Sequence, residues 1–117
     1  MSARQVLPGL WQVRISFVNA FLLDTSDGLI LVDTGIPGSA RVLEQALASI
    51  GKRPADVRHI FVTHCHADHA GSLAEMKRRT GAPATMHPLD AAMVREGKCR
   101  RPLVPWPFWA RPDRENR

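Results

Sequence analysis

Four residues able to bind a metal ion lie close together in the stretch THCHADHAGS, which begins at Thr63. They are His64, His66, Asp68 and His69, and they include three of the five histidines in the chain. Imidazole nitrogen and carboxylate oxygen are ligands that zinc and similar metals prefer, and catalytic zinc sites keep an open position for water. The cluster therefore predicts a metal site that can activate water.

The spacing of these residues also indicates how they point. At the end of a strand, His64 and His66 are two positions apart and project to the same side, so both can reach one ion. Cys65 projects the other way and is expected to be a small buried residue, with a thiolate ligand as the alternative. Asp68 and His69 lie beyond the turn, where they can face a second ion. Two ions together clamp a bridging hydroxide and lower its pKa toward neutrality.

Packing is the alternative explanation for any single histidine. We adopt it for His59 and His87, because neither has a second donor beside it in the sequence. For the cluster, packing would have to supply a separate partner for each of three imidazoles and one carboxylate, because buried polar groups are costly without one. We therefore favour the metal site for the cluster.

The segments around the cluster show strand and helix patterns. An Asp-Gly pair at Asp27 indicates a hairpin, and the apolar run 29–32 that follows predicts a strand buried on both faces. Ser72 with Glu75 three residues later matches a capping box at a helix start. The expected strands are 11–17, 19–25, 29–34, 58–64 and 82–87, and the expected helices are 40–51, 72–81 and 88–97. This order predicts the α/β class, a sheet covered by helices.

Length and charge limit the possible functions. A chain of 117 residues fits a single domain. Residues 1–94 have a net charge of +1 and residues 95–117 a net charge of +4, so the basicity belongs to the tail, and without a binding motif we expect no nucleic-acid partner. The apolar runs are shorter than the ~20 residues of a membrane span, and the start lacks a secretion signal. The sequence therefore predicts a cytoplasmic protein with no membrane contact.

The end of the chain differs in composition from the rest. It contains the stretch RRPLVPWPFWARPDRENR, in which proline is too dense for a regular helix or a central strand. We therefore expect a domain at residues 1–94 and an irregular, basic, Pro- and Trp-rich tail at 95–117. The alternative is a membrane-interface or partner-binding role for Trp106, Phe108 and Trp109.

These motifs resemble those of the metallo-β-lactamase-fold hydrolases. The resemblance rests on LILVDTG ending at Gly35, on the strand HIFVTH, and on the signature His-X-His-X-Asp-His. It implies an αββα sandwich of two similar halves, and this chain matches the N-terminal half from about Leu10 to His87. Glutamate at position 66 would have indicated the diiron oxygen reductases of this fold, and His66 stands there instead. The loop FVNAFLLDTSDGLILVDTG is most similar to the glyoxalase II-like branch.

The resemblance implies a role for each residue of the cluster. His64 and His66 bind the first ion, and Asp68 and His69 bind the second. Asp68 also orients the metal-bound hydroxide that attacks an ester, thioester, lactone or amide-like bond of a small-molecule substrate. Asp33 matches an acidic position beside the site that steadies its loops, and a turn-forming aspartate is the alternative. The expected ions are Zn²⁺, although iron and manganese suit the same ligands.

The second half of the family pattern has no counterpart in this sequence. After His87 there is no histidine and no GHTPG-like stretch, and Asp90 and Asp113 are in the wrong context for a bridging carboxylate. We therefore expect a truncated member, inactive alone, that exposes the face normally packed on the second half and can self-associate there. The alternatives are a non-catalytic metal-binding or interaction module and an enzyme completed by a second chain. The substrate is not predicted, because the loops that shape its site come largely from the second half.

Replacement of the first two histidines tests the ligand assignment. In any intact version of the protein, His64→Ala or His66→Ala is expected to lower metal content and activity together, because each change removes a donor of the first ion. Cys65→Ser is expected to leave both nearly unchanged, because its side chain points away. Metal analysis and turnover of the purified variants measure both effects. Full activity in His66→Ala would contradict the assignment.

Overall fold

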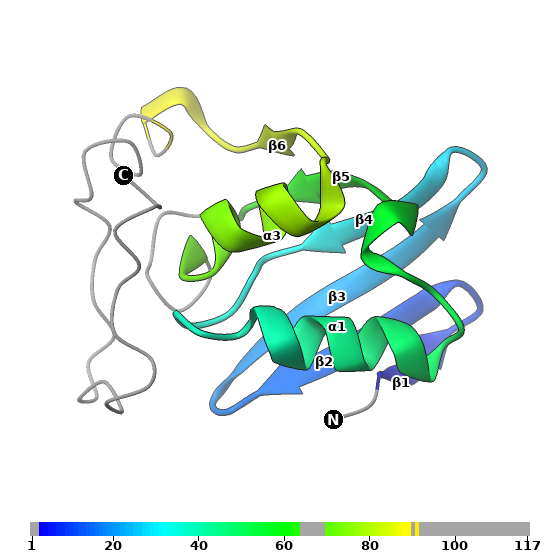
Figure 1. The fold of residues 1–117 in the computed structure, drawn as a ribbon. Coiled ribbons are helices and arrows are strands. Elements are labelled where there is room, and N and C mark those ends of the chain that lie inside the picture. The colour runs from blue at the N-terminus through cyan, green and yellow to red at the C-terminus, as the bar shows by residue number, and fades with distance from the viewer. Residues whose placement is uncertain (1–2, 64–69, 90, 92–117) are drawn as a thin grey trace.

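The computed structural model describes residues 3–63, 70–89 and 91, which form one sheet with helices packed against it (Figure 1). The strands are β1 (Arg4–Leu7), β2 (Leu10–Ile15), β3 (Val18–Thr25), β4 (Gly28–Val32), β5 (Val57–Phe61) and β6 (Ala84–Thr85). The helices are α1 (Ala40–Ser49), the short 3-10 helix η1 (Pro54–Asp56) and α3 (Leu73–Thr80). This mixed architecture confirms the predicted α/β class.

The sheet combines an antiparallel meander with parallel strands, and the strands lie in the order of the sequence. β1 to β4 pair antiparallel through short turns, whereas β4, β5 and β6 pair parallel. Parallel neighbours need a crossover connection, and α1 and α3 lie in the two crossovers. The carboxyl ends of β4 and β5 therefore lie side by side at one end of the sheet.

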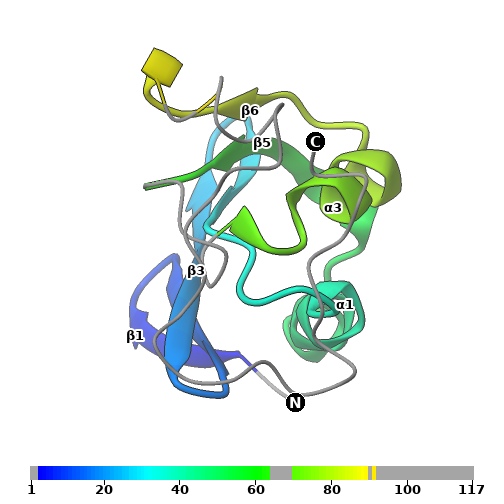
Figure 2. The same cartoon turned by 90° about the vertical axis from the view of Figure 1, so that its left-hand side faces the viewer.

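The hydrophobic core lies between the sheet and the two helices, and Figure 2 shows α1 and α3 on the same side of the sheet. Alternate strand residues point to this side, as Leu22 and Leu31 do from opposite positions on β3 and β4. Leu43 and Leu47 of α1 and Met76 of α3 cover them, and all five are almost completely buried. Removal of this apolar surface from water is the main favourable contribution to folding.

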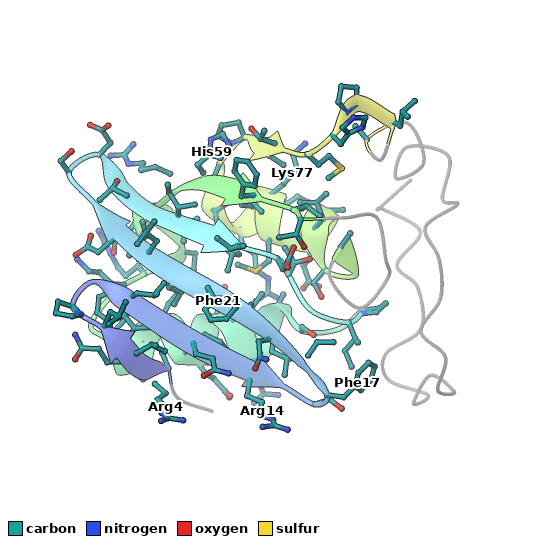
Figure 3. The ribbon with its side chains drawn as sticks, turned by 180° about the vertical axis from the view of Figure 1, so that it is seen from behind. Arg4, Arg14, Phe17, Phe21, His59 and Lys77 are labelled. Atoms are coloured by element: carbon teal, nitrogen blue, oxygen red, sulfur yellow. The ribbon has the colours of Figure 1, made fainter. Side chains whose placement is uncertain are left out.

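The opposite side of the sheet is not covered by any described helix, and Figure 3 shows it facing the viewer with Phe21 near its middle. Apolar side chains from four adjacent strands gather there. We call this surface the outer face, and it consists of Leu10, Phe21, Leu23, Ile30, Val32 and Phe61. Phe61 remains 47% exposed and Leu23 38% exposed. A contiguous apolar surface of this kind is typical of a site that packs against another layer.

One-sided coverage explains a wrong prediction about β4. Its apolar run indicated burial on both faces, but only Leu29 and Leu31 are buried, each with 1% of its surface exposed. Ile30 and Val32 belong to the outer face and are only partly buried. The run is apolar on both sides because both sides are suited to packing, and the described part of the chain covers one of them.

Most of the other expected elements are confirmed, with boundaries shifted by a few residues. β1 was not predicted, because its four residues are all exposed and show no alternation of apolar and polar types. Of the expected helix 88–97, residues 88, 89 and 91 are described and helical. The boundary between the 1–94 domain and its tail lies outside the described residues. Among the described helices, none is long and apolar enough to cross a membrane.

Truncation of one side chain on each face tests where the core lies. Leu31→Ala is expected to lower the free energy of unfolding by about 2–5 kcal/mol, because it leaves a cavity in the core. Phe61→Ala, in the neighbouring strand but on the outer face, is expected to cost less than about 1 kcal/mol. Urea unfolding of the two variants measures both. Equal costs would contradict a one-sided core and would show that the outer face is covered in solution.

Candidate metal centre

The flanks of the candidate metal centre lie near the end of the sheet where β4 and β5 finish. The predicted ligands themselves lie outside the described residues: His64, His66, Asp68 and His69. We call residues 64–69 the ligand segment, and the structure describes the chain on both sides of it. Thr63 precedes the segment and residues 70–72 follow it. A single loop, residues 33–39, contacts both flanks.

Asp33 holds the flank that precedes the ligand segment. Its Oδ1 accepts a hydrogen bond of 2.8 Å from the backbone N–H of Thr63. The Thr63 hydroxyl donates to the same carboxylate, 2.9 Å from Oδ2 and 3.1 Å from Oδ1. The backbone N–H of Asp33 in turn donates to the Phe61 carbonyl at 2.7 Å. Asp33 is 4% exposed, and its carboxylate fixes Thr63, the residue immediately before His64.

The backbone of Asp33 is also unusual. Its φ of 66° is in the left-handed region, which aspartate tolerates better than most residues because its short polar side chain can bond locally. This conformation agrees with the turn-forming alternative for Asp33. The turn directs the carboxylate at Thr63, so turn and carboxylate act on the same flank. The role of Asp33 beside a metal ion stays a prediction.

The flank that follows the ligand segment is held by the same 33–39 loop. The backbone N–H of Gly71 donates to the Gly35 carbonyl at 2.9 Å. The backbone N–H of Ser72 donates to the Thr34 hydroxyl at 3.2 Å. The Ser72 hydroxyl donates to the Ile36 carbonyl at 2.8 Å. Three hydrogen bonds thus join residues 71–72 to residues 34–36.

The capping box expected at the start of α3 is not formed. Ser72 is the N-cap residue, but its side chain makes no capping hydrogen bond. Glu75 instead binds the guanidinium of Arg79 at 2.6 Å, one helical turn later. The serine hydroxyl is engaged with the 33–39 loop, so tertiary contact replaces the local cap that the sequence pattern predicted.

Gly35 allows the 33–39 loop to turn tightly beside the core. Its φ is 72°, a conformation that side chains rarely adopt. A Cβ at this position would lie 2.8 Å from Cδ1 of Ile15 and 2.9 Å from the Ser39 hydroxyl. Glycine is therefore required both by the backbone conformation and by the space beside the core.

The donor chemistry of the ligand segment fits a divalent metal ion. Three imidazoles and one carboxylate within six residues provide ligands that zinc accepts, on a segment whose two flanks are fixed. Among the described residues, which do not include this segment, no group of three or more His, Cys, Asp or Glu side chains could hold an ion. The two histidines outside the segment have other hydrogen-bond partners. His59 bonds the Thr85 hydroxyl at 2.6 Å, and Nδ1 of His87 accepts from the Leu89 N–H at 3.2 Å.

The residues that fix the second flank carry no signal in the sequence that predicts this role. Thr34 and Ser39 had no assigned role, and Ser72 was assigned to a local cap. Both Ser39 and Thr34 are fully buried, although they stand in a Gly- and Pro-containing loop of a kind that usually lies at the surface. No spacing rule in the sequence links them to a segment more than thirty residues later.

A family model agrees with this architecture. Residues 13–106 match the model of the metallo-beta-lactamase superfamily. The chain belongs to the metallo-beta-lactamase superfamily. Members of this superfamily generally bind divalent metal ions, and the matched residues include the whole ligand segment and both of its flanks.

Curated relatives include enzymes with different activities. The chain is 36% identical over 63 residues to the exodeoxyribonuclease WalJ of Streptococcus pneumoniae, which is 54% of this chain and 23% of that protein. It is 46% identical over 54 residues to the human metallo-beta-lactamase domain-containing protein 1, which is 46% of this chain and 20% of that protein. The chain thus spans less than a quarter of the length of these relatives.

A solved structure shows the same fold. A metallo-beta-lactamase from Cronobacter sakazakii, a mutant in its HARLDQ motif, is 33% identical to the chain with a TM-score of 0.79. The alignment covers 84% of this chain and 39% of that one. The chain therefore has the fold of part of a metallo-beta-lactamase, as the sequence predicted. Its place in the glyoxalase II-like branch stays a prediction.

Removal of the Asp33 carboxylate tests its effect on the ligand segment. Asp33→Ala is expected to lower the free energy of unfolding by about 1–3 kcal/mol, because the Thr63 N–H loses its acceptor. It is also expected to weaken zinc binding about 10–100-fold, the usual cost of losing a group that orients a ligand. Asp33→Asn keeps one acceptor oxygen and tolerates the left-handed backbone. Its stability and its zinc affinity are therefore expected to lie between those of the wild-type chain and of Asp33→Ala. Urea unfolding and zinc titration measure the two effects, and unchanged zinc affinity in Asp33→Ala would contradict the role.

Proposed function

We propose that the chain is the metal-binding part of a metal-dependent hydrolase. The observation that carries this proposal is that one loop, residues 33–39, holds both flanks of a segment containing four candidate metal ligands. A ligand segment with fixed ends suits a catalytic site, because metal-site chemistry depends on ligand orientation. Membership of the superfamily supports the general class of hydrolase.

Each residue of the segment has a proposed role. His64 and His66 hold one divalent ion, and Asp68 and His69 hold a second. A bound ion of this kind supplies Lewis acidity, which lowers the pKa of a water molecule. Asp68 also accepts a hydrogen bond that orients the attacking water, and Asp33 keeps Thr63 and therefore the start of the segment in position. Zn²⁺ is the proposed metal, and iron and manganese suit the same donors.

The proposed reaction is hydrolysis of an ester, thioester, lactone or amide-like bond in a small molecule. The +1 net charge of residues 1–94 supports a small-molecule substrate, because it leaves little excess basic charge in that part of the chain for a nucleic acid. The exodeoxyribonuclease among the relatives shows that members of this superfamily also act on DNA. The assay therefore includes DNA as a comparison substrate.

We further propose that catalysis needs ligands from beyond this chain. The sequence has no histidine after His87, so the donors available to each ion are few. The outer face supports this proposal, because six apolar side chains on four strands are suited to packing against another layer. When the chain is alone in solution, we propose that the outer face packs against the outer face of a second copy. Non-catalytic metal binding is the alternative function of the isolated chain.

A zinc titration of the purified chain tests the proposal. A complete four-ligand structural site binds zinc with about 10–16 kcal/mol near pH 7. This chain has part of such a set, so its dissociation constant is expected to be no tighter than about 1 μM, or roughly 8 kcal/mol. Binding is expected to weaken below pH ~6.5, because protonated imidazole does not bind metal. No appreciable hydrolysis of thioesters, lactones, β-lactams or DNA is expected.

Three outcomes separate the possibilities. A chain that binds no zinc, or that keeps full zinc affinity in His66→Ala, contradicts the metal centre. Tight stoichiometric zinc with zinc-dependent hydrolysis would show that a second copy completes the site. Sedimentation of the same samples reports self-association, and a strict monomer at high concentration would contradict packing of two outer faces.

A further inference from the structure

Two buried serine hydroxyls lie where the 33–39 loop meets the start of α3. Ser39 is fully buried and Ser72 is 1% exposed. The Ser72 hydroxyl accepts a 2.8 Å hydrogen bond from the backbone N–H of Ser39 and donates one of 2.8 Å to the Ile36 carbonyl. The Ser39 hydroxyl donates to the same carbonyl at 2.6 Å. Ile36 therefore accepts from both serines.

Neither serine uses its hydroxyl in the way its position favours. Ser39 is the N-cap residue of α1 and Ser72 the N-cap residue of α3, and neither side chain makes a capping hydrogen bond. A side-chain cap commonly stabilises a helix, so both helix starts give up a local interaction. The Ser72 hydroxyl instead joins two segments more than thirty residues apart in the sequence.

The two hydroxyls differ in what they connect. The Ser39 bond to Ile36 lies within the 33–39 loop. The Ser72 bond to Ile36 instead joins that loop to the start of α3, three residues after His69. Its acceptor and donor bonds are both used, so its orientation is fixed from two directions. A rotation of this hydroxyl would leave either the Ser39 N–H or the Ile36 carbonyl with one partner fewer, which is costly in a buried site.

We propose that Ser72 is a positioning residue for the ligand segment. The Ser72 hydroxyl anchors the carboxyl-terminal flank of this segment to the 33–39 loop. It acts through the backbone of residues 70–72, and it complements Asp33, which anchors the other end. The inference rests on the proposed function, because positioning has a purpose only if the segment binds a metal ion. It adds a residue outside the His-X-His-X-Asp-His signature to those that shape the site.

Ser72→Ala and Ser39→Ala form a matched pair for the test. Both remove a buried hydroxyl that donates to Ile36, so both should lower the melting temperature of the 117-residue chain. Only Ser72→Ala removes side-chain hydrogen bonds between the 33–39 loop and residue 72, while the Gly71 and Ser72 backbone N–H bonds to that loop remain. We therefore expect zinc affinity to fall about 10-fold in Ser72→Ala, and to change little in Ser39→Ala. Thr34→Val, which removes the acceptor of the Ser72 N–H while keeping a β-branched shape, should shift affinity in the same direction and serves if Ser72→Ala does not fold.

Amide hydrogen exchange without metal provides an independent measurement. The Gly71 N–H bonds the Gly35 carbonyl, and its exchange is expected to be faster in Ser72→Ala or Thr34→Val than in Ser39→Ala. Equal zinc affinity and equal Gly71 exchange in the serine pair would overturn the inference. A wild-type chain that binds no zinc would contradict the proposed function instead, and Gly71 exchange would then decide the positioning role alone.

Discussion

The 33–39 loop is the constraint on which the rest of the site depends. It begins where β4 ends, and the carboxylate of its first residue, Asp33, accepts hydrogen bonds from the backbone N–H and the hydroxyl of Thr63, two residues after β5 ends. Its later residues bind Gly71 and Ser72 at the start of α3. A six-residue segment with both ends fixed loses less conformational freedom when it binds an ion than a free peptide would. Folding of the two flanks would thus meet part of the entropy cost of the proposed metal site.

The sheet explains why this loop can reach both flanks. Because β4 and β5 are parallel neighbours, their carboxyl ends lie together, and ligands of α/β proteins commonly bind at such ends. The crossover helices α1 and α3 pack on one side of the sheet, and Arg79 of α3 joins them through Glu44 of α1 at 2.6 Å. The same arrangement leaves the outer face without a described layer. In the Cronobacter sakazakii enzyme, the matched region is 39% of the chain, so most of that protein lies beyond it.

The sequence predicted most of the fold because its signals were local. The hairpin at Asp27, the periodicity of α1 and the glycine that ends α3 at Gly81, with its left-handed φ of 70°, are all set by neighbouring residues. The strand expected directly before the ligand segment followed from the same signals, and β5 confirms it. The serine and threonine bonds could not be predicted, because they join segments distant in sequence and compete with a local cap at Ser72. One-sided burial of β4 was also unpredictable, since an apolar run fits either arrangement.

X-ray absorption at the zinc edge of the zinc-loaded chain tests the central claim most directly, that the ligand segment holds the ion through imidazole and carboxylate. The account predicts a first shell of nitrogen and oxygen at about 2.0–2.2 Å, with the outer-shell scattering of imidazole rings. It also predicts that this scattering diminishes in His64→Ala. A sulfur scatterer at about 2.3 Å would show that a cysteine, Cys65 or Cys99, binds the ion. A first shell without imidazole features would show that the histidine cluster does not bind it. Either result would contradict the account.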